Sequence, residues 1–395
     1  MGTVGKVMGS FHVLVIGGGS TGAAVAHDLA LRGLKVTLVE RGEIASGTTG
    51  RNHCLLHSGG RYCMSDKVSA VECAQENAIL RRIMPGSMEL NDGLFVALNE
   101  QDLIFAERFR DACADCGIRA EWLTPEQVLA LEPNVSPHNL GAFRVPDGVF
   151  EPMRFCLSFL ASAKSNGARI LPFIRVEDLV VHGHSVRGVK IRDRIRGHSD
   201  QIGADLVVNA AGPWSAKIGA MASVEVPVAP TPGVMISIRG RHTQRVINRL
   251  GLPADGDIVV PQRETSIVGT TSWTVQDADY IPIPDDHVQL LLKRGLELVP
   301  SLAESEPRGI FTVARPLIRW KNDDEREIPR SFVSIDHAAE GIEGLVSVLG
   351  GKTTTARTMA EETADLVCAK LGIEASCRTR ETELLSYRAY YHAED

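Results

Sequence analysis

Apolar and polar positions fall into distinct blocks at the start of the chain. Residues 12–16 form an apolar run that predicts a buried strand, residues 20–32 have the pattern of a helix, and a second apolar run ending at Glu40 predicts another strand. A strand, a helix and a strand within about thirty residues are typical of a βαβ unit. This pattern predicts an α/β fold.

Two later apolar runs each end in a turn of small residues. Residues 206–208 lead into NAAGPW, and residues 344–349 lead into GGKTTT, which a helical pattern follows as far as about residue 371. Both segments predict a strand that enters a close-packed turn. The second also predicts a helix that begins directly after its turn.

The middle of the chain has a different period. Residues 233–240, 257–262 and 265–272 alternate between apolar and polar side chains, and Pro, Gly and Asp separate them. This alternation predicts strands. No internal repeat or low-complexity tract interrupts the pattern.

Composition narrows the class of protein. A length of 395 residues suits two domains or one elaborate domain, and a hydrophobic content of 44% is ordinary for a globular protein. The net charge of −7 gives no sign of nucleic-acid binding. No segment approaches the ~20 apolar residues that cross a bilayer, and the first ten residues lack the core of a signal peptide. A cytoplasmic protein without a transmembrane segment is therefore expected.

Eight cysteines are scattered along the chain and do not resemble a disulfide framework. Cys113 and Cys116 form a CxxC at a predicted helix end, without a second pair or nearby histidines. Ordinary packing is the favoured interpretation, and no metal site is expected.

The first turn carries a dinucleotide-binding motif. Gly17, Gly19 and Gly22 form G-x-G-x-x-G between a predicted strand and a predicted helix. Such glycines allow the turn, the approach of a pyrophosphate and close packing of helix on strand. Glu40 stands 18 residues after Gly22, where a carboxylate accepts bonds from ribose hydroxyls and repels the 2′-phosphate of NADP.

The motif alone leaves NAD and FAD open. The segments 204–215 and 344–372 favour FAD, because the second predicts a late helix whose first N–H groups are available to an electron-rich flavin edge. A nicotinamide enzyme has no need of that helix.

With these residues in place, the chain resembles the FAD-dependent glycerol-3-phosphate dehydrogenases, especially the anaerobic multi-subunit type, within the D-amino-acid-oxidase-like flavoproteins. The likeness covers about residues 11–377 and is carried by VIGGGSTGAAVAHDLALRGLKVTLVER, ASGTTGRNHCLLHSGGRY, VPDGVFEPMRF, VVNAAGPW, DIVVPQRETSIVGTTS, VARPLI and VLGGKTTTARTMAEETADLVC.

This resemblance implies a discontinuous Rossmann-like FAD-binding domain with an inserted α+β substrate domain built on an antiparallel sheet. The FAD-binding domain is expected at 8–78, 145–220 and 320–377, the substrate domain at 79–144 and 221–319, and a tail at 378–395. The cofactor-binding residues that it implies are Gly17, Gly19, Ser20, Thr21, Gly22, Glu40, Arg41, Thr48, Thr49, Arg51, Asn52, His53, His57, Ser58, Gly59, Val176, Ala210, Ala211, Gly212, Trp214, Gly351, Lys352, Thr353 and Thr354.

The segment LLHSGGRYC, residues 55–63, is expected to pass along the flavin. By the resemblance, Arg61, Arg315 and Lys352 bind an anionic substrate, since a desolvated phosphate or carboxylate needs several charged donors. The alternative for the arginines is solvated surface charge. His57 is the expected proton acceptor or, alternatively, a core histidine, and Tyr62 either bonds a substrate oxygen or packs.

The resulting functional hypothesis is oxidation of an anionic secondary alcohol, sn-glycerol 3-phosphate first, with hydride passing to flavin N5. His57 removes the hydroxyl proton while Arg315 or Lys352 stabilises the alkoxide. The alternatives are a 2-hydroxy-acid dehydrogenase, an amino-acid or amine oxidase, and a flavin-bearing electron-relay subunit. No histidine or cysteine demands covalent attachment of the flavin.

Several features depart from the family pattern. The chain stops at Asp395, so the iron–sulfur-binding region of the anaerobic type is expected to be absent. Electrons are then expected to pass to partner subunits, a quinone or oxygen. A peripheral position at the inner face of the cell membrane is one option. Ala356 stands where a tyrosine is expected, which predicts a reshaped cavity. Arg319 and Lys321 either bind a second anionic group or form a solvated turn, and the tail either docks or packs.

Overall fold

The computed structural model describes residues 11–319 and 331–392. Its six-stranded sheet has, in order, β19 (Phe332–Asp336), β20 (Leu345–Gly350), β13 (Leu206–Asn209), β1 (His12–Ile16), β2 (Lys35–Val39) and β9 (Arg169–Leu171). All neighbours in it pair in parallel except β19, which is antiparallel to β20. This confirms the predicted parallel βαβ unit.

The central strand β1 is buried on both faces. Val13 and Val15 pack into the core that β1 shares with three helices, α1 (Ser20–Leu31), α5 (Pro152–Ser165) and α8 (Ala356–Leu371). Leu14 and Ile16 point to the other face, against a three-stranded sheet of β10 (Ile174–His182), β11 (Ser185–Asp193) and β12 (Ser199–Gly203). Two covered faces explain why the run is apolar throughout rather than alternating.

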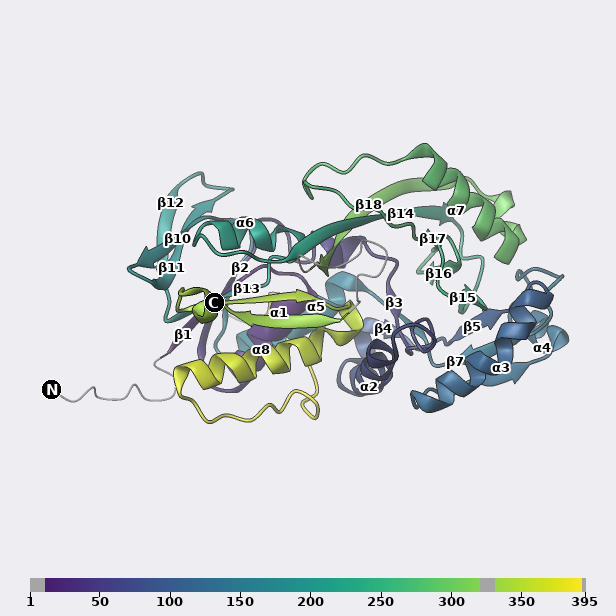
Figure 1. Cartoon of the computed structure of the whole chain (residues 1–395), viewed down its shortest axis with the longest axis horizontal. Helices are drawn as coiled ribbons and strands as arrows, with labels where there is room; N and C mark the ends of the chain where they lie inside the picture. The colour runs from purple at the N-terminus through teal and green to yellow at the C-terminus, as the bar shows by residue number, and fades with distance from the viewer. Residues whose placement is uncertain (1–10, 320–330, 393–395) are drawn as a thin grey trace.

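The second large sheet has eight strands. In order they are β18 (Pro307–Ile318), β14 (Val228–Arg239), β17 (Thr265–Gly269), β16 (Ile258–Gln262), β15 (Val246–Arg249), β5 (Gly93–Val96), β7 (Ala142–Val145) and β6 (Glu121–Leu123). Its pairs are antiparallel apart from β15 with β5. Figure 1 shows this sheet on the opposite side of the molecule from β1 and α1, with β14 and β18 reaching between the two halves.

Strand β14 is longer than the sequence pattern predicted. It begins at Val228 and includes Pro230 and Pro232, which lack an N–H. Both prolines lie opposite β18, and β17 pairs only with the later part of β14, from Met235 onward. The prolines are tolerated because no β17 ladder runs beside them.

Helices cover both faces of the eight-stranded sheet. Helix α7 (Asp285–Leu298) packs Leu291 and Leu298 on β14, and α3 (Glu100–Asp115) packs Phe109 on the opposite side of the sheet, on β5 and β7. Cys113 and Cys116 lie buried in the same apolar cluster as Phe109, which agrees with ordinary packing. The remaining elements are α2 (Lys67–Ile83), α4 (Pro125–Leu131), α6 (Ser215–Ala220) and a small sheet of β3 (Leu55–Leu56), β8 (Gly148–Phe150) and β4 (Met88–Glu89).

The molecule has two halves, one built around the six-stranded sheet and one around the eight-stranded sheet, and segments far apart in the chain meet in each. The six-stranded sheet draws on residues 12–39, 169–209 and 332–350, and the eight-stranded sheet on 93–145 and 228–318. The expected α/β class with a second, mainly antiparallel sheet is confirmed, while the exact domain boundaries stay a prediction. None of the helices within 11–319 and 331–392 has both the length and the apolar character to cross a bilayer.

The described part of the tail lies against α2 and α5. The backbone N–H of Leu384 donates to the carbonyl of Ile83, that of Leu385 donates to Ser162 Oγ, and Tyr387 stacks with Arg154. The tail is packed as far as Tyr390, whereas Tyr391 is 68% exposed. Lys321 lies outside the described residues.

Candidate functional site

Glycines at the end of β1 bring the start of α1 against the strand. A Cβ on Gly22 would lie 1.9 Å from the carbonyl oxygen of Gly17, and one on Gly17 would lie 2.5 Å from that of Ala210. Gly17 also has a φ of +112°, which favours glycine. Gly19 offers α1 no side-chain cap, so the first N–H groups of the helix take outside partners, as Ser20 does with Thr49 Oγ1 at 3.0 Å.

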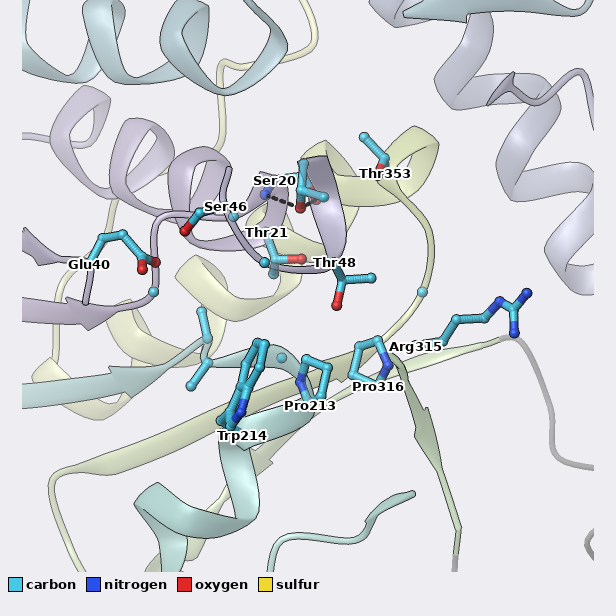
Figure 2. A pocket seen from close by; sticks show the side chains of 18 of the residues that line it. Ser20, Thr21, Glu40, Ser46, Thr48, Pro213, Trp214, Arg315, Pro316 and Thr353 are labelled. Carbon is cyan, nitrogen blue, oxygen red and sulfur yellow. Dashed lines mark hydrogen bonds between the residues drawn. The ribbon is translucent and has the colours of Figure 1, made fainter. Parts of the chain in front are cut away.

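A cavity of about 350 Å³ runs along this turn. It lies at the carboxyl ends of β1, β2, β13 and β20, which is where open α/β sheets bind ligands. Residues 315–317 of β18 form another part of its wall, so both large sheets contribute. Figure 2 shows Glu40 at one end of the view and Arg315 and Thr353 at the other.

Glu40 is fixed at the first end by two backbone donors. Its Oε2 accepts the Gly18 N–H at 2.7 Å, and its Oε1 accepts the Gly42 N–H at 2.8 Å. A carboxylate oxygen accepts more than one bond, so both oxygens keep capacity for ligand hydroxyls. Arg41, the next residue, stacks on Trp214 with its Cζ 3.9 Å from the ring centroid.

Four polar side chains form a contiguous group near Thr353. Lys352 Nζ lies 4.6 Å from the centroid of the Tyr62 ring, the Tyr62 ring lies 5.2 Å from that of His57, and the two imidazoles of His57 and His53 are 5.9 Å apart. All four line the cavity. A cation and two imidazoles at one place can bind an anion and move a proton.

The two histidines differ in their surroundings. Burial, assisted by the positive charges of Arg61 and Arg315, lowers the pKa of His53 to about 3. The Leu55 N–H donates to its Nδ1 at 3.3 Å. His53 is therefore neutral near pH 7 and a poor proton acceptor.

The loop that carries His57 is held by buried side chains from three other segments. The His57 N–H donates to Thr354 Oγ1 at 3.1 Å, and Asn77 Nδ2 donates to the His57 carbonyl at 3.1 Å. The next N–H, of Ser58, donates to the buried carboxylate of Asp147 at 2.7 Å. Such a fixed backbone sets the position of the imidazole.

Arg315 reaches the cavity from β18. Its Nη2 donates to Thr270 Oγ1 at 2.8 Å and to the Thr271 carbonyl at 3.1 Å, and its Nη1 donates to the Pro232 carbonyl at 3.2 Å. These acceptors hold the guanidinium in place. Its positive potential is felt inside the cavity, as the lowered pKa of His53 indicates.

Arg61 has a different arrangement. It does not line the cavity, and its guanidinium donates to Asp257 at 2.7 Å and to Asn248 Oδ1 at 2.9 Å. The carboxylate of Asp257 is buried and sits in an ion pair with it. Arg61 therefore influences the cavity through its positive charge, which lowers the pKa of His53, and does not form part of the cavity wall.

Most of the residues predicted for the cofactor and substrate line this one cavity. They are Gly17, Gly19, Ser20, Thr21, Glu40, Arg41, Thr48, Thr49, Asn52, His53, His57, Tyr62, Val176, Ala210, Ala211, Gly212, Trp214, Arg315, Gly351, Lys352 and Thr353. Six others do not line it: Gly22, Arg51, Ser58, Gly59, Arg61 and Thr354. Neither Ala356, which is fully buried in the apolar core, nor Arg319 lines the cavity, so the small side chain of Ala356 does not shape its wall.

Sequence reasoning missed several residues of the site. Ser46 and Gly47 line the cavity beside a motif that was recognised, so the signal was present. Lys217 and Asp279 also line it, but they come from a short helix and a long loop without any motif. Asn77 and Asp147 lie behind the His57 loop, where only the tertiary contacts reveal them.

Within the described residues, no group of three or more His, Cys, Asp or Glu side chains could hold a metal ion.

Comparison with known proteins identifies matches over most of the chain. The profile of the FAD-dependent oxidoreductases (DAO) matches residues 12–366. The chain is 43% identical over 385 residues to a subunit of the anaerobic glycerol-3-phosphate dehydrogenase of Haloferax volcanii, covering 94% of this chain and 66% of that protein. It is 42% identical over 382 residues to a subunit of the anaerobic glycerol-3-phosphate dehydrogenase of Escherichia coli K12, covering 95% and 70%.

A solved structure matches as well. The glycerol-3-phosphate dehydrogenase of Bacillus halodurans, complexed with FAD, superposes with a TM-score of 0.73 at 25% identity, covering 95% of this chain and 68% of that one. The chain thus spans about two thirds of the length of these relatives.

Proposed function

Because the chain belongs to the FAD-dependent oxidoreductase family, we propose that it oxidises the secondary alcohol of sn-glycerol 3-phosphate to the ketone and passes the electrons to a partner subunit or a quinone. The observation that carries this proposal is a single cavity with a dinucleotide turn and Glu40 on one side and a cationic, imidazole-bearing wall on the other.

The residues present fit FAD. Gly17 and Gly22 let the start of α1 pack directly against the end of β1. The uncapped start of α1 offers N–H groups to a pyrophosphate, and Glu40 keeps acceptor capacity for ribose hydroxyls. At the other end Gly351 has a φ of +68° and would place a Cβ 2.4 Å from Met359 Sδ. The backbone there comes close to the cavity, beside the start of α8.

When bound, FAD supplies the two-electron acceptor that takes a hydride from the alcohol carbon. In the proposal His57 accepts the hydroxyl proton, because it lines the cavity and its backbone is held from two sides. His53 is unsuited to that task, since a pKa of about 3 makes it a weak base. Tyr62 lies between His57 and Lys352 and is placed to bond a substrate oxygen.

Anion binding is assigned to Arg315 and Lys352. Both line the cavity, and a phosphate stripped of water needs several charge-assisted donors. Arg61 adds positive potential from behind, held by Asp257. A dianionic substrate is therefore favoured over a neutral alcohol.

The route by which electrons leave is also a proposal. The relatives in Haloferax volcanii and Escherichia coli are named as subunits, which supports transfer to a partner subunit. A quinone at the inner face of the membrane is the second acceptor to test.

Anaerobic titration of the FAD-loaded protein tests the substrate. We expect sn-glycerol 3-phosphate to bleach the flavin absorbance stoichiometrically, and glycerol, 2-hydroxy acids and amino acids to leave it largely unchanged. Bleaching by a 2-hydroxy acid or an amino acid but not by glycerol 3-phosphate would replace the proposal by one of the other activities considered. If no small molecule bleaches the flavin with a partner subunit present, that result would support the electron-relay alternative.

A further inference from the structure

A loop from the eight-stranded sheet crosses to the Glu40 end of the cavity. It comprises residues 270–284 and connects β17 to α7. One residue of it, Asp279, lines the cavity together with Glu40, Arg41 and Trp214, which belong to the other half of the molecule. No sequence motif accounts for this contact.

Asp279 accepts bonds from three side chains on the far side. Lys217 Nζ lies 2.6 Å from its Oδ2, and Trp214 Nε1 and Arg41 Nη1 lie 2.6 and 3.3 Å from its Oδ1. Arg41 also stacks on Trp214, so the three donors form one group. Asp277 adds a bond of 3.2 Å to Lys217 and accepts the Asp279 N–H at 3.0 Å.

The rest of the loop has little to hold it there. The backbone N–H groups of Trp273 and Val275 donate to carbonyls of β14, still on the loop's own sheet. Beyond them Tyr280 is 77% exposed, and few apolar side chains of the segment are buried. The carboxylates of Asp277 and Asp279 supply the hydrogen bonds that join this loop to the other half.

We propose that Asp279 ties the 270–284 loop across the adenosine end of the cavity and so slows the exchange of FAD. The proposal rests on FAD binding, which the family shares, and not on the identity of the substrate. The geometric basis is that a ligand beside Glu40 and Arg41 has Asp279 at the wall of the same cavity, so we expect the tied loop to hinder the ligand from leaving.

The tie, meaning the hydrogen bonds of Asp279 with Arg41, Trp214 and Lys217, can slow the release of FAD and still break reversibly. Its charged members are 42–55% exposed, so water screens each pair. Three donors on one carboxylate nevertheless act together, because releasing the loop breaks all of them at once. We expect loss of the tie to raise the rate of FAD release by about tenfold.

The test compares FAD release from the loaded parent protein with that from Asp279→Asn and Lys217→Met. Loaded protein is diluted, and bound and free flavin are separated by rapid gel filtration at successive times. Asn keeps the size of Asp but loses its charge, so Asp279→Asn should release FAD about tenfold faster. Lys217→Met leaves the bonds of Trp214 and Arg41 to Asp279 in place, so it should accelerate release by a smaller factor. Asp115→Asn, which breaks an exposed 3.1 Å pair between α3 and Lys67 away from the cavity, is the matched control and should match the parent.

The double variant separates a tie from direct ligand contacts. If Lys217 acts through its bond to Asp279, the Asp279→Asn/Lys217→Met protein should release FAD no faster than Asp279→Asn alone. Hydrogen exchange supplies a second readout: amides of residues 276–282 should be protected in the loaded parent and lose that protection in Asp279→Asn.

The proposal is overturned if Asp279→Asn releases FAD within twofold of the parent, if the effects of the two substitutions multiply, or if the parent takes up no FAD. A parent that binds FAD tightly and shows the expected variant rates, but is not reduced by glycerol 3-phosphate, would contradict only the proposed substrate.

Discussion

At the residue scale, the environment of two neighbouring histidines separates their proposed roles. His53 is surrounded by protein and by the fields of Arg61 and Arg315, which keep it neutral. His57 lies 5.9 Å away between His53 and Tyr62, on a loop held by Thr354 and Asn77. We therefore propose His57 as the proton acceptor, because His53 is too weak a base.

Replacing His57 by Asn tests this assignment. We expect turnover to fall by about 10²–10⁴-fold, the usual contribution of a general base, while the flavin absorbance of the purified protein is retained. Steady-state kinetics with glycerol 3-phosphate give the measurement. The same change at His53 should cost much less, and an enzyme that keeps full turnover with Asn at position 57 would exclude it as the base.

Lys352 is expected to bind the substrate anion directly. Lys352→Met removes a charged donor of similar length, so KM for glycerol 3-phosphate should rise by roughly 10–100-fold, corresponding to about 1.5–3 kcal/mol for a bond to a charged group. Lys352→Arg keeps a positive charge beside the Tyr62 ring and serves as the control, with a KM closer to that of the parent. Equal KM values for Lys352→Met and the parent would place anion binding elsewhere.

At the scale of elements, helix α1 carries an unusual buried group. His27 is 1% exposed, and within the described residues neither ring nitrogen has a hydrogen-bond partner. Burial lowers its pKa to about 4. Its ring packs 5.8 Å from that of Phe159 on α5, so α1 and α5 meet around a histidine that must stay neutral.

This histidine makes the stability of the fold depend on pH. The unfolded chain protonates His27 near its ordinary pKa of 6.5, and the folded chain only near 4, so the unfolded state binds more protons between these values. Stability is full above about pH 6.5 and falls as pH drops towards 4, by roughly 3 kcal/mol in all. Denaturant unfolding of the parent and of His27→Leu across this range measures it.

The variant should lose that part of the pH dependence and be at least as stable at pH 7, because Leu has no unbonded polar atoms to bury. Parallel pH profiles for the two proteins would show that His27 does not titrate in this way.

At the scale of the whole molecule, the cavity lies where the two sheets meet. Residues 315–317 and Asp279 come from the side of the eight-stranded sheet, and the glycine turn and Lys352 from the side of the six-stranded sheet. Thr48 Oγ1 also donates to the Ala314 carbonyl at 2.7 Å, directly across the boundary. A ligand that fills the cavity contacts both halves.

Removal of FAD should therefore lower the stability of both halves together. With FAD at about a thousand times its Kd, binding to the folded state contributes about 4 kcal/mol, and the unfolding temperature should rise steadily with FAD concentration. Differential scanning calorimetry at several FAD concentrations gives the measurement. An unfolding temperature that does not respond to FAD would contradict ligand binding at this boundary.

Much of the site could be predicted from the sequence because it depends on local chemistry. Gly17 and Gly22 are needed because backbone carbonyl oxygens lie 2.5 and 1.9 Å from where a Cβ would stand, and Glu40 must end a strand. Contiguous patterns of this kind leave a signal in the order of residues. The α/β class and most of the cavity lining could be predicted for this reason.

Other features arose only from the tertiary structure. The sequence determined the dinucleotide turn, the buried strands and the cationic residues, since each follows from neighbours along the chain. Folding decided that Arg61 pairs with Asp257, that Asn77 and Asp147 hold the His57 loop, and that Asp279 reaches the Glu40 end of the cavity. These contacts join residues 20 to 238 positions apart, and no local pattern specifies which distant partner a charged or polar side chain meets.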